Sequence, residues 1–232
     1  MAETHGKERC PSCPERKYCI PGHLPQLCPK GFYCPEGTGL DWKPCPPGTY
    51  NPVQGIRSVI ECQVCDGGKF CQYHNATDVT GECWEGFYCT QGSDRPNPIA
   101  QLNEQAGPCP SGYYCPRGTI IPNPCPVGTF AAGSRLHSEV ECSPCLPGHF
   151  CSTPGLPAPT GPCEEGFFCI LGSVLPNPLT TSQSGGPCPQ GTFVFKIPPP
   201  WSTANVQLGI TALLAQCLKI SFHVLKGLTT PT

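Results

Sequence analysis

Cysteine is the residue type in this chain whose spacing could do chemistry. Thiols can pair as disulfides, bind zinc as thiolates, or take part in redox catalysis. Six of the 21 cysteines recur 80 positions later in the sequence. Cys45, Cys62, Cys65, Cys71, Cys83 and Cys89 return as Cys125, Cys142, Cys145, Cys151, Cys163 and Cys169. This register indicates an internal repeat.

Disulfide formation fits the spacing best. Zinc would use the C-x2-C pairs Cys10/Cys13, Cys62/Cys65 and Cys142/Cys145, but each pair stands alone and is followed by more cysteines than a four-thiolate site needs. Redox catalysis lacks the βαβ context that such pairs normally have. An intracellular zinc protein stays the alternative.

The pairing of the cysteines is not deducible from their number, since eight cysteines alone allow about 105 connectivities. A repeated gap of sixteen residues does suggest two bridges, Cys45 to Cys62 and Cys125 to Cys142. Each would stabilise the fold by about 3 kcal/mol if it is unstrained. We therefore expect cross-links to take the place of a hydrophobic core.

The odd cysteine total leaves at least one thiol without a partner in the chain. Cys217 is the first candidate because it lies outside the repeat. Cys188 is the second, because its register matches Cys109 but Val194 stands where the next cysteine is expected.

Catalysis is not indicated by any other residues. The six histidines are scattered, with no repeated spacing to acids or to a serine. We expect a non-enzyme without a cofactor, a metal or a small-molecule substrate.

Composition supports a small, loop-rich architecture. The 232 residues include 27 Gly and 32 Pro, which disfavour long helices and central strands. A net charge of -2 offers no basic stripe, so a nucleic-acid partner is not expected. Disulfides imply an oxidising compartment.

The cysteine pattern divides the chain into four segments. We expect a partial repeat at 10–61, a complete one at 62–141, a truncated one at 142–193, and a tail at 194–232 outside the repeat.

Aromatic pairs follow the repeated C-x2-G phrase. Gly86 and Gly112 can take the positive φ of a tight turn, which lets the next two residues, Phe87 with Tyr88 and Tyr113 with Tyr114, fold over a neighbouring cystine. These aromatics are expected to be packing residues of each module.

Asn75-Ala76-Thr77 is an N-x-[ST] sequon in the variable loop between Cys71 and Cys83. A glycan at Asn75 is expected if the chain is exported.

The tail predicts an amphipathic helix beginning near Asn205, with Ile210, Leu213 and Cys217 on its apolar face. Polar residues interrupt the run, so it is a poor transmembrane span. Docking to a membrane surface or partner helix is one interpretation, and an alternative exon without a selected role is the other.

The first residues, MAETHGKERCPSC, show no apolar run of a secretory signal peptide. Since the cysteines indicate export, we expect a fragment or alternative product of a longer secreted or membrane protein. A membrane connection would then come only through missing parts of the parent. A non-functional splice product is the further alternative.

The phrases CPPGTYNPVQGIRSVIECQVCDGGKFC and CPVGTFAAGSRLHSEVECSPCLPGHFC resemble the cysteine-rich repeat of ephrin type A/B receptors, which is related in style to tumour necrosis factor receptor modules. The resemblance covers residues 10 to about 193. It implies a small disulfide-rich fold, an elongated tandem array of short β-hairpin and loop modules with little regular secondary structure. It also implies an extracellular spacer or an ectodomain that binds an unidentified protein ligand.

Overall fold

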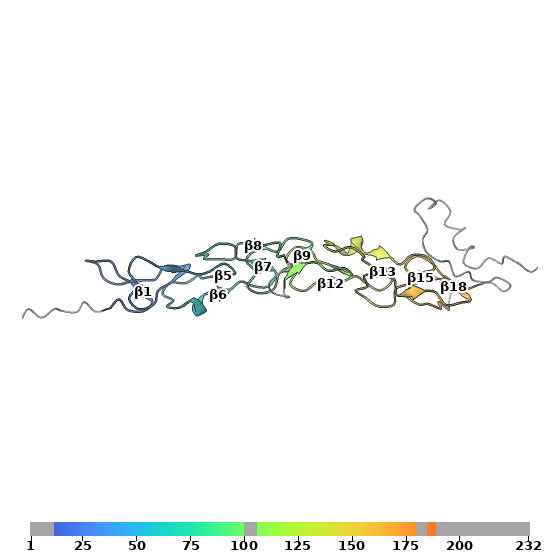
Figure 1. Ribbon diagram of the computed structural model, residues 1–232, viewed down its shortest axis with the longest axis horizontal. Helices are drawn as coiled ribbons and strands as arrows, with labels where there is room; N and C mark the ends of the chain where they lie inside the picture. Colours follow the sequence, from blue (N-terminus) through green and yellow to red (C-terminus); the bar gives the residue numbers. More distant parts are fainter. Residues whose placement is uncertain (1–11, 100–105, 180–184, 189–232) are drawn as a thin grey trace, which may run out of the picture. The chain divides into compact units, whose positions relative to one another are not determined.

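The computed structural model describes residues 12–99, 106–179 and 185–188 (Figure 1). The chain divides into two compact units. The N-terminal unit takes its described residues from Met1–Pro108 and Cys115–Pro122, and the C-terminal unit from Cys109–Tyr114 and Asn123–Thr232. One copy of the repeated cysteine phrase begins in each unit, at Cys45 and at Cys125.

The N-terminal unit is built from two-stranded antiparallel hairpins. Each pairs consecutive strands: β1 with β2, β3 with β4, β5 with β6, β7 with β8 and β9 with β10. Their bounds are β1 Lys17–Tyr18, β2 Gln26–Leu27, β3 Phe32–Tyr33, β4 Lys43–Pro44, β5 Thr49–Tyr50, β6 Gln63–Val64, β7 Lys69–Phe70, β8 Gly81–Glu82, β9 Phe87–Tyr88 and β10 Gly107–Pro108. A 3-10 turn, η1 (Val59–Glu61), precedes β6.

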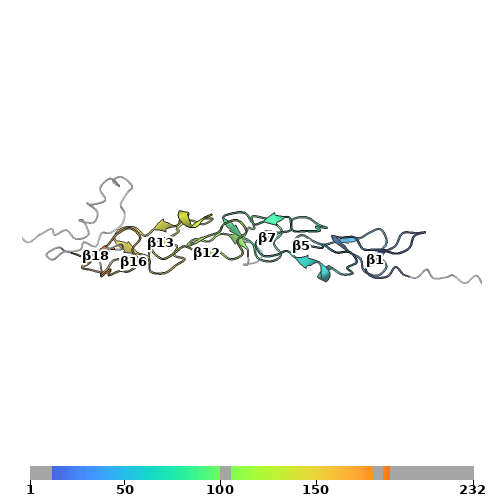
Figure 2. The ribbon, with the colours of Figure 1, turned by 180° about the vertical axis from the view of Figure 1, so that it is seen from behind.

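The C-terminal unit repeats this plan with β11 to β18, again paired in sequence order as antiparallel hairpins. The bounds are β11 Tyr113–Tyr114, β12 Asn123–Pro124, β13 Thr129–Phe130, β14 Ser143–Pro144, β15 His149–Phe150, β16 Gly161–Pro162, β17 Phe167–Cys169 and β18 Gly185–Pro187. The 3-10 turn η2 (Glu139–Glu141) occupies the place of η1. Figures 1 and 2 show loops outweighing strand arrows in both units.

A proline-glycine turn starts many of these hairpins. Before β5, the Thr49 amide donates to the Pro46 carbonyl at 3.1 Å, and Gly48 between them has φ 80°. This is the geometry of a type II turn, which needs a positive φ at its third residue and so favours glycine there. The positive φ predicted for Gly86 and Gly112 is confirmed, at 78° and 88°.

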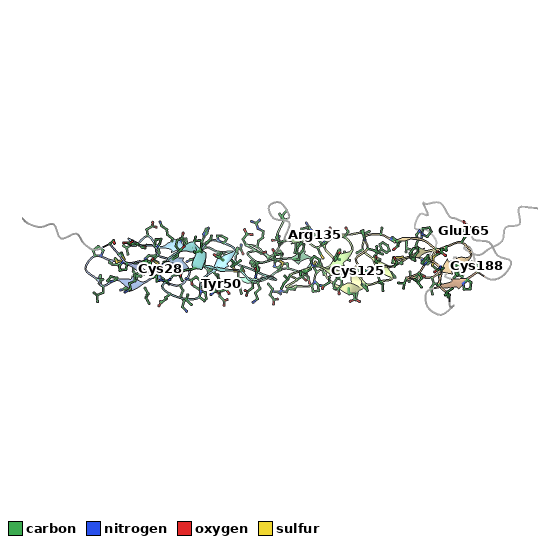
Figure 3. All side chains as sticks on the ribbon, turned by 90° about the horizontal axis from the view of Figure 1, so that it is seen from below. Cys28, Tyr50, Cys125, Arg135, Glu165 and Cys188 are labelled. Carbon is green, nitrogen blue, oxygen red and sulfur yellow. A yellow bond between two sulfur atoms is a disulfide. The ribbon has the colours of Figure 1, made fainter. Side chains whose placement is uncertain are left out.

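Cystines form the interior of both units. Many half-cystines have no exposed surface, among them Cys28 and Cys125, which Figure 3 labels within the ribbon. In the N-terminal unit Cys45, Ile56 and Cys62 form one buried cluster, against which Tyr33 packs. The C-terminal unit has the matching cluster of Cys125, Ala131 and Cys142, covered by Tyr114 and Leu136.

Backbone hydrogen bonds connect each hairpin to the next within a unit. The Gly48 amide donates to the Cys71 carbonyl at 2.8 Å, while the Gly48 carbonyl accepts from the Cys65 amide at 2.9 Å. One hairpin further along the chain, the Gly68 amide donates to the Cys89 carbonyl at 2.8 Å, and the Gly68 carbonyl accepts from the Cys83 amide at 2.9 Å. These bonds satisfy buried backbone groups that strands of two residues cannot pair by themselves.

The predicted fold class is confirmed as a disulfide-rich series of small antiparallel hairpins. Within 12–99, 106–179 and 185–188 the helical segments are only η1 and η2. None of the described helices is long and apolar enough to cross a lipid bilayer. The amphipathic helix predicted from Asn205 falls outside the described residues.

Candidate interaction surface and its cystine framework

The framework consists of short-range disulfides. In the N-terminal unit the pairs are Cys13–Cys19, Cys28–Cys34, Cys45–Cys62, Cys65–Cys71 and Cys83–Cys89. In the C-terminal unit they include Cys125–Cys142, Cys145–Cys151 and Cys163–Cys169. The structure thus joins both pairs that the sixteen-residue gap suggested, with Cα–Cα distances of 5.9 and 5.8 Å.

The C-x2-C pairs are divided between different bridges. Cys62 bonds to Cys45, whereas Cys65 bonds to Cys71. Cys142 and Cys145 are divided in the same way. Zinc binds thiolates, and a half-cystine has none to offer. The described residues contain no cluster of three or more His, Cys, Asp or Glu side chains able to hold a metal ion.

The two predicted free thiols have different outcomes. Cys188 is disulfide-bonded in the structure, so the expectation of a free thiol there is corrected. It lies just after β18, and its amide donates to the Gly166 carbonyl at 2.8 Å. The missing cysteine at position 194 therefore does not leave Cys188 unpaired. Cys217 lies outside the described residues.

Asn75, the sequon residue, occupies a left-handed turn. Its φ is 55°, and its amide donates to the Cys45 carbonyl at 3.0 Å. Gly155 holds the matching position in the second copy, with φ 75° and the same bond to Cys125. Asparagine tolerates this conformation better than most residues do. The side chains of Asn75 and Thr77 are exposed.

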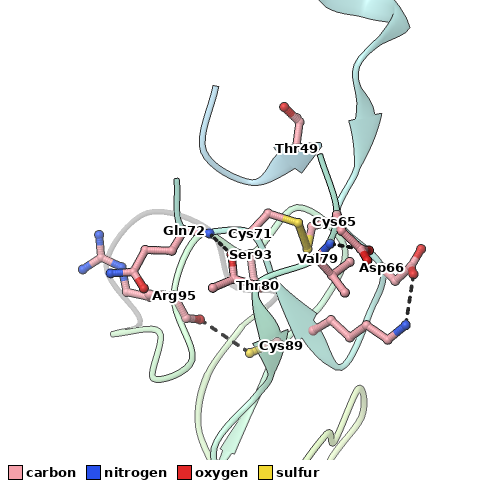
Figure 4. The surroundings of a disulfide bond; sticks show 12 residues. Thr49, Cys65, Asp66, Cys71, Gln72, Val79, Thr80, Cys89, Ser93 and Arg95 are labelled. Carbon is pink, nitrogen blue, oxygen red and sulfur yellow. Dashed lines mark hydrogen bonds and ion pairs between the residues drawn. A yellow bond between two sulfur atoms is a disulfide. The ribbon is translucent and has the colours of Figure 1, made fainter. Parts of the chain in front are cut away.

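A groove opens on the N-terminal unit beside the Cys65–Cys71 bridge. It has a volume of about 510 Å³, and its lining includes Pro47, Gln72, Trp84, Asp94, Arg95 and Pro96. Figure 4 shows Gln72 and Arg95 on the same side of the bridge. Trp84 is 54% exposed, so part of this aromatic residue is open to a ligand.

Hydrogen bonds to the backbone hold the walls of this groove. The Trp84 amide donates to the Pro96 carbonyl at 2.9 Å, and the Cys71 amide donates to the Ser93 carbonyl at 2.9 Å. Ser93 is buried, and its hydroxyl donates to the Thr90 carbonyl at 2.9 Å. The loop carrying Asp94 and Arg95 is thereby tied at several points.

Electrostatics at the groove come from one neighbouring pair. Arg95 Nε and Nη2 donate to the two carboxylate oxygens of Asp94, at 3.1 and 3.2 Å. This hydrogen bonding lowers the pKa of Asp94 and raises that of Arg95. Both groups stay charged across the physiological range.

Elsewhere, the shifted pKa values belong to surface contacts. The Lys43 pKa is raised by its hydrogen bond to Asp41. The Tyr114 pKa is raised by burial and by the Glu139 carboxylate, to which its hydroxyl donates at 3.3 Å.

Sequence reasoning missed the groove, although a signal for it exists. Aligning the two copies at their spacing of 80 residues places Glu164 opposite Trp84 and Leu175 opposite Arg95. This difference between the two copies would have indicated that the surface around Trp84 and Arg95 is specific to the first copy.

The geometry defines a cysteine-rich, disulfide-linked repeat protein. No family model matches the chain. A stretch of 61 residues is 38% identical to human tumor necrosis factor receptor superfamily member 14. The match covers 24% of this chain and 22% of the receptor's length, so the chain spans about a fifth of that relative. The similarity supports cysteine-rich repeats of the tumour necrosis factor receptor type.

Proposed function

We propose that this chain is a non-enzymatic, extracellular cysteine-rich repeat region that serves as a spacer or as a protein-interaction ectodomain. It would form part of a larger secreted or membrane protein. The partial match to a tumour necrosis factor receptor superfamily member supports a protein ligand rather than a small molecule. The similarity is confined to a stretch of the chain, so the ligand of that receptor is not carried over.

One observation supports this proposal most strongly: most of the buried side chains among the described residues are half-cystines. Among the described residues, the buried apolar side chains other than cysteine are Ile56, Phe70 and Ala131. Large apolar side chains such as Leu24, Ile60 and Val140 are 86%, 87% and 91% exposed. Such a chain depends on its disulfides, and disulfides persist in oxidising compartments.

The finer assignments belong to the same proposal. We assign cysteine-rich repeats to 10–61, 62–141 and 142–193, of the kind found in ephrin type A/B receptors, and a separate tail to 194–232. A glycan on Asn75 fits its exposed loop.

Disulfide mapping of the protein from its native source tests the compartment. Free thiols are alkylated before lysis, and peptides are then analysed by mass spectrometry without reduction. We expect the bridges Cys45–Cys62, Cys65–Cys71 and Cys125–Cys142, in material recovered outside the cell. Alkylated cysteines at these positions in an intracellular pool would contradict the proposal.

Binding to an array of extracellular proteins distinguishes an ectodomain from a spacer. The oxidised chain is compared with a control that has been reduced and alkylated. Binding that requires the disulfides supports the ectodomain role. If both forms bind nothing while export is confirmed, the spacer role is favoured.

A further inference from the structure

The groove at Trp84 combines an exposed aromatic side chain and two prolines with polar and charged neighbours. Pro47 and Pro96 share its lining with the exposed indole of Trp84. Grooves that combine aromatic and apolar walls in this way bind extended, proline-containing peptides, because the polyproline II helix is already ordered before binding. The backbone around the groove is held by hydrogen bonds from Cys71 and Trp84, so little ordering is required on binding.

Arg95 adds a directional charge to the groove lining. A guanidinium has two edges that can each hold a carboxylate through paired N–H groups. Asp94 uses the edge formed by Nε and Nη2. The other edge, formed by Nη1 and Nη2, has no partner among the described residues, and the Arg95 side chain is 55% exposed. Asp94 therefore orients Arg95 and leaves one carboxylate site open.

The second copy shows what the same backbone looks like without these features. The Glu164 amide donates to the Pro176 carbonyl at 2.9 Å, as the Trp84 amide does to Pro96. However, the Glu164 side chain accepts from Asn177 at 3.0 Å, and an exposed Leu175 stands at the Arg95 position. The indole, the guanidinium and its carboxylate partner are thus specific to the first copy, and the shared framework does not require them.

We propose that this groove binds an extended segment of a partner protein in which an aspartate or glutamate lies beside proline. The proline ring would pack on the Trp84 indole between Pro47 and Pro96, and the carboxylate would pair with the open edge of Arg95. This proposal deepens the ectodomain role and rests on it, because it names the chemistry of the protein ligand.

A pair of synthetic peptides tests the proposal on the full oxidised chain. The probe is acetyl-Pro-Pro-Leu-Glu-Pro-Pro-amide, and its control replaces Glu with Gln. Binding is followed by the indole N–H resonance of Trp84, assigned with W84F. We expect saturable shifts with the probe, and affinity about two- to fivefold weaker with the Gln peptide, as loss of a half-exposed ion pair predicts.

R95L copies the residue of the second repeat and should weaken the probe to the level of the Gln peptide. V127P/E164W/V174D/L175R, which places the proline, the indole, the carboxylate and the guanidinium of the groove at the matching positions of the second copy, should create a second binding site. Equal binding of both peptides, or full binding by R95L, would overturn the proposal. So would the absence of any shift at millimolar probe, or self-association of the chain that W84A abolishes, which would make a second copy the occupant.

Native disulfide mapping keeps the two proposals separate. If the peptides fail while the chain is exported and oxidised, the groove assignment is wrong and the proposed function stands. If the native chain is intracellular and reduced, the proposed function is wrong whatever the peptides do.

Discussion

At the scale of single residues, glycine positions are constrained by close backbone approach as well as by their φ angle. Gly31 has φ 80°, and a Cβ built on it would lie 2.2 Å from the Asn75 carbonyl oxygen. Its amide also donates to the Asn51 carbonyl at 3.0 Å. A side chain at Gly31 would separate two segments that the fold holds in contact.

We therefore expect Gly31→Ala to destabilise the protein more than Gly22→Ala. Gly22 has φ 82° but nothing within 4 Å of the position that a Cβ would occupy, so its substitution should cost only the left-handed strain of about 1 to 2 kcal/mol. Gly31→Ala should exceed this by at least about 1 kcal/mol because the backbone must move. Urea unfolding with the disulfides intact measures both. Equal losses would show that the contact with Asn75 is unimportant.

The glycan expected on Asn75 can be tested without disturbing its turn. Thr77→Ala removes the sequon but leaves Asn75 at φ 55°, and the Thr77 side chain is exposed. For the chain secreted from mammalian cells, we expect digestion with an N-glycosidase to lower the mass of the wild type only. The wild type and the variant should unfold at the same urea concentration once deglycosylated. A wild type that digestion leaves unchanged would exclude occupancy.

At the scale of elements, the two kinds of disulfide should differ in their contribution. Cys45–Cys62 spans 17 residues and Cys65–Cys71 spans 6, so the first restricts the unfolded chain more. On loop entropy, C45A/C62A should cost about 3 kcal/mol and C65A/C71A about 2 kcal/mol. Chemical unfolding of both double variants gives the comparison. The reverse order would mean that native packing, and not the entropy of the unfolded chain, determines how much each disulfide stabilises the protein.

How much could be predicted from the sequence differs among these elements. The sixteen-residue gap repeated in both copies suggested Cys45 with Cys62, and C-x2-G predicted the turn at Gly86. Pairing between Cys65 and Cys71 could not be deduced, because number and spacing allow many connectivities. The groove was missed for another reason: Pro47 is far from Trp84 and Arg95 in the sequence and lines the same groove only in the folded chain.

At the scale of the whole molecule, the chain should lose its structure on reduction. Its described buried apolar residues are nearly all half-cystines, with Ile56, Phe70 and Ala131 as the exceptions. Once reduced, such a chain has too little apolar burial to offset the conformational entropy of folding. We expect rapid proteolysis of the reduced and alkylated chain under conditions in which the oxidised chain persists. A reduced chain that resists protease equally well would contradict the cystine core.

Stability should also be local, because each hairpin bonds mainly to its neighbours. In the N-terminal unit the Gly68 amide donates to the Cys89 carbonyl, and the Cys83 amide donates to the Gly68 carbonyl. Gly31, which precedes β3, instead donates to Asn51, which follows β5. Proteins in which each unit contacts only the next have stabilities that are sums of unit and interface contributions.

Removal of one bridge tests this description. C83A/C89A should speed amide hydrogen exchange at Gly68, because its acceptor at position 89 is no longer held by a disulfide. Exchange at Gly31 should stay at the wild-type rate, since Asn51 and its surroundings keep their own bridge, Cys45–Cys62. Exchange is measured residue by residue by nuclear magnetic resonance on the oxidised variant. Equal acceleration at both amides would show that the unit unfolds as one cooperative body, so that loss of one cross-link destabilises all of it.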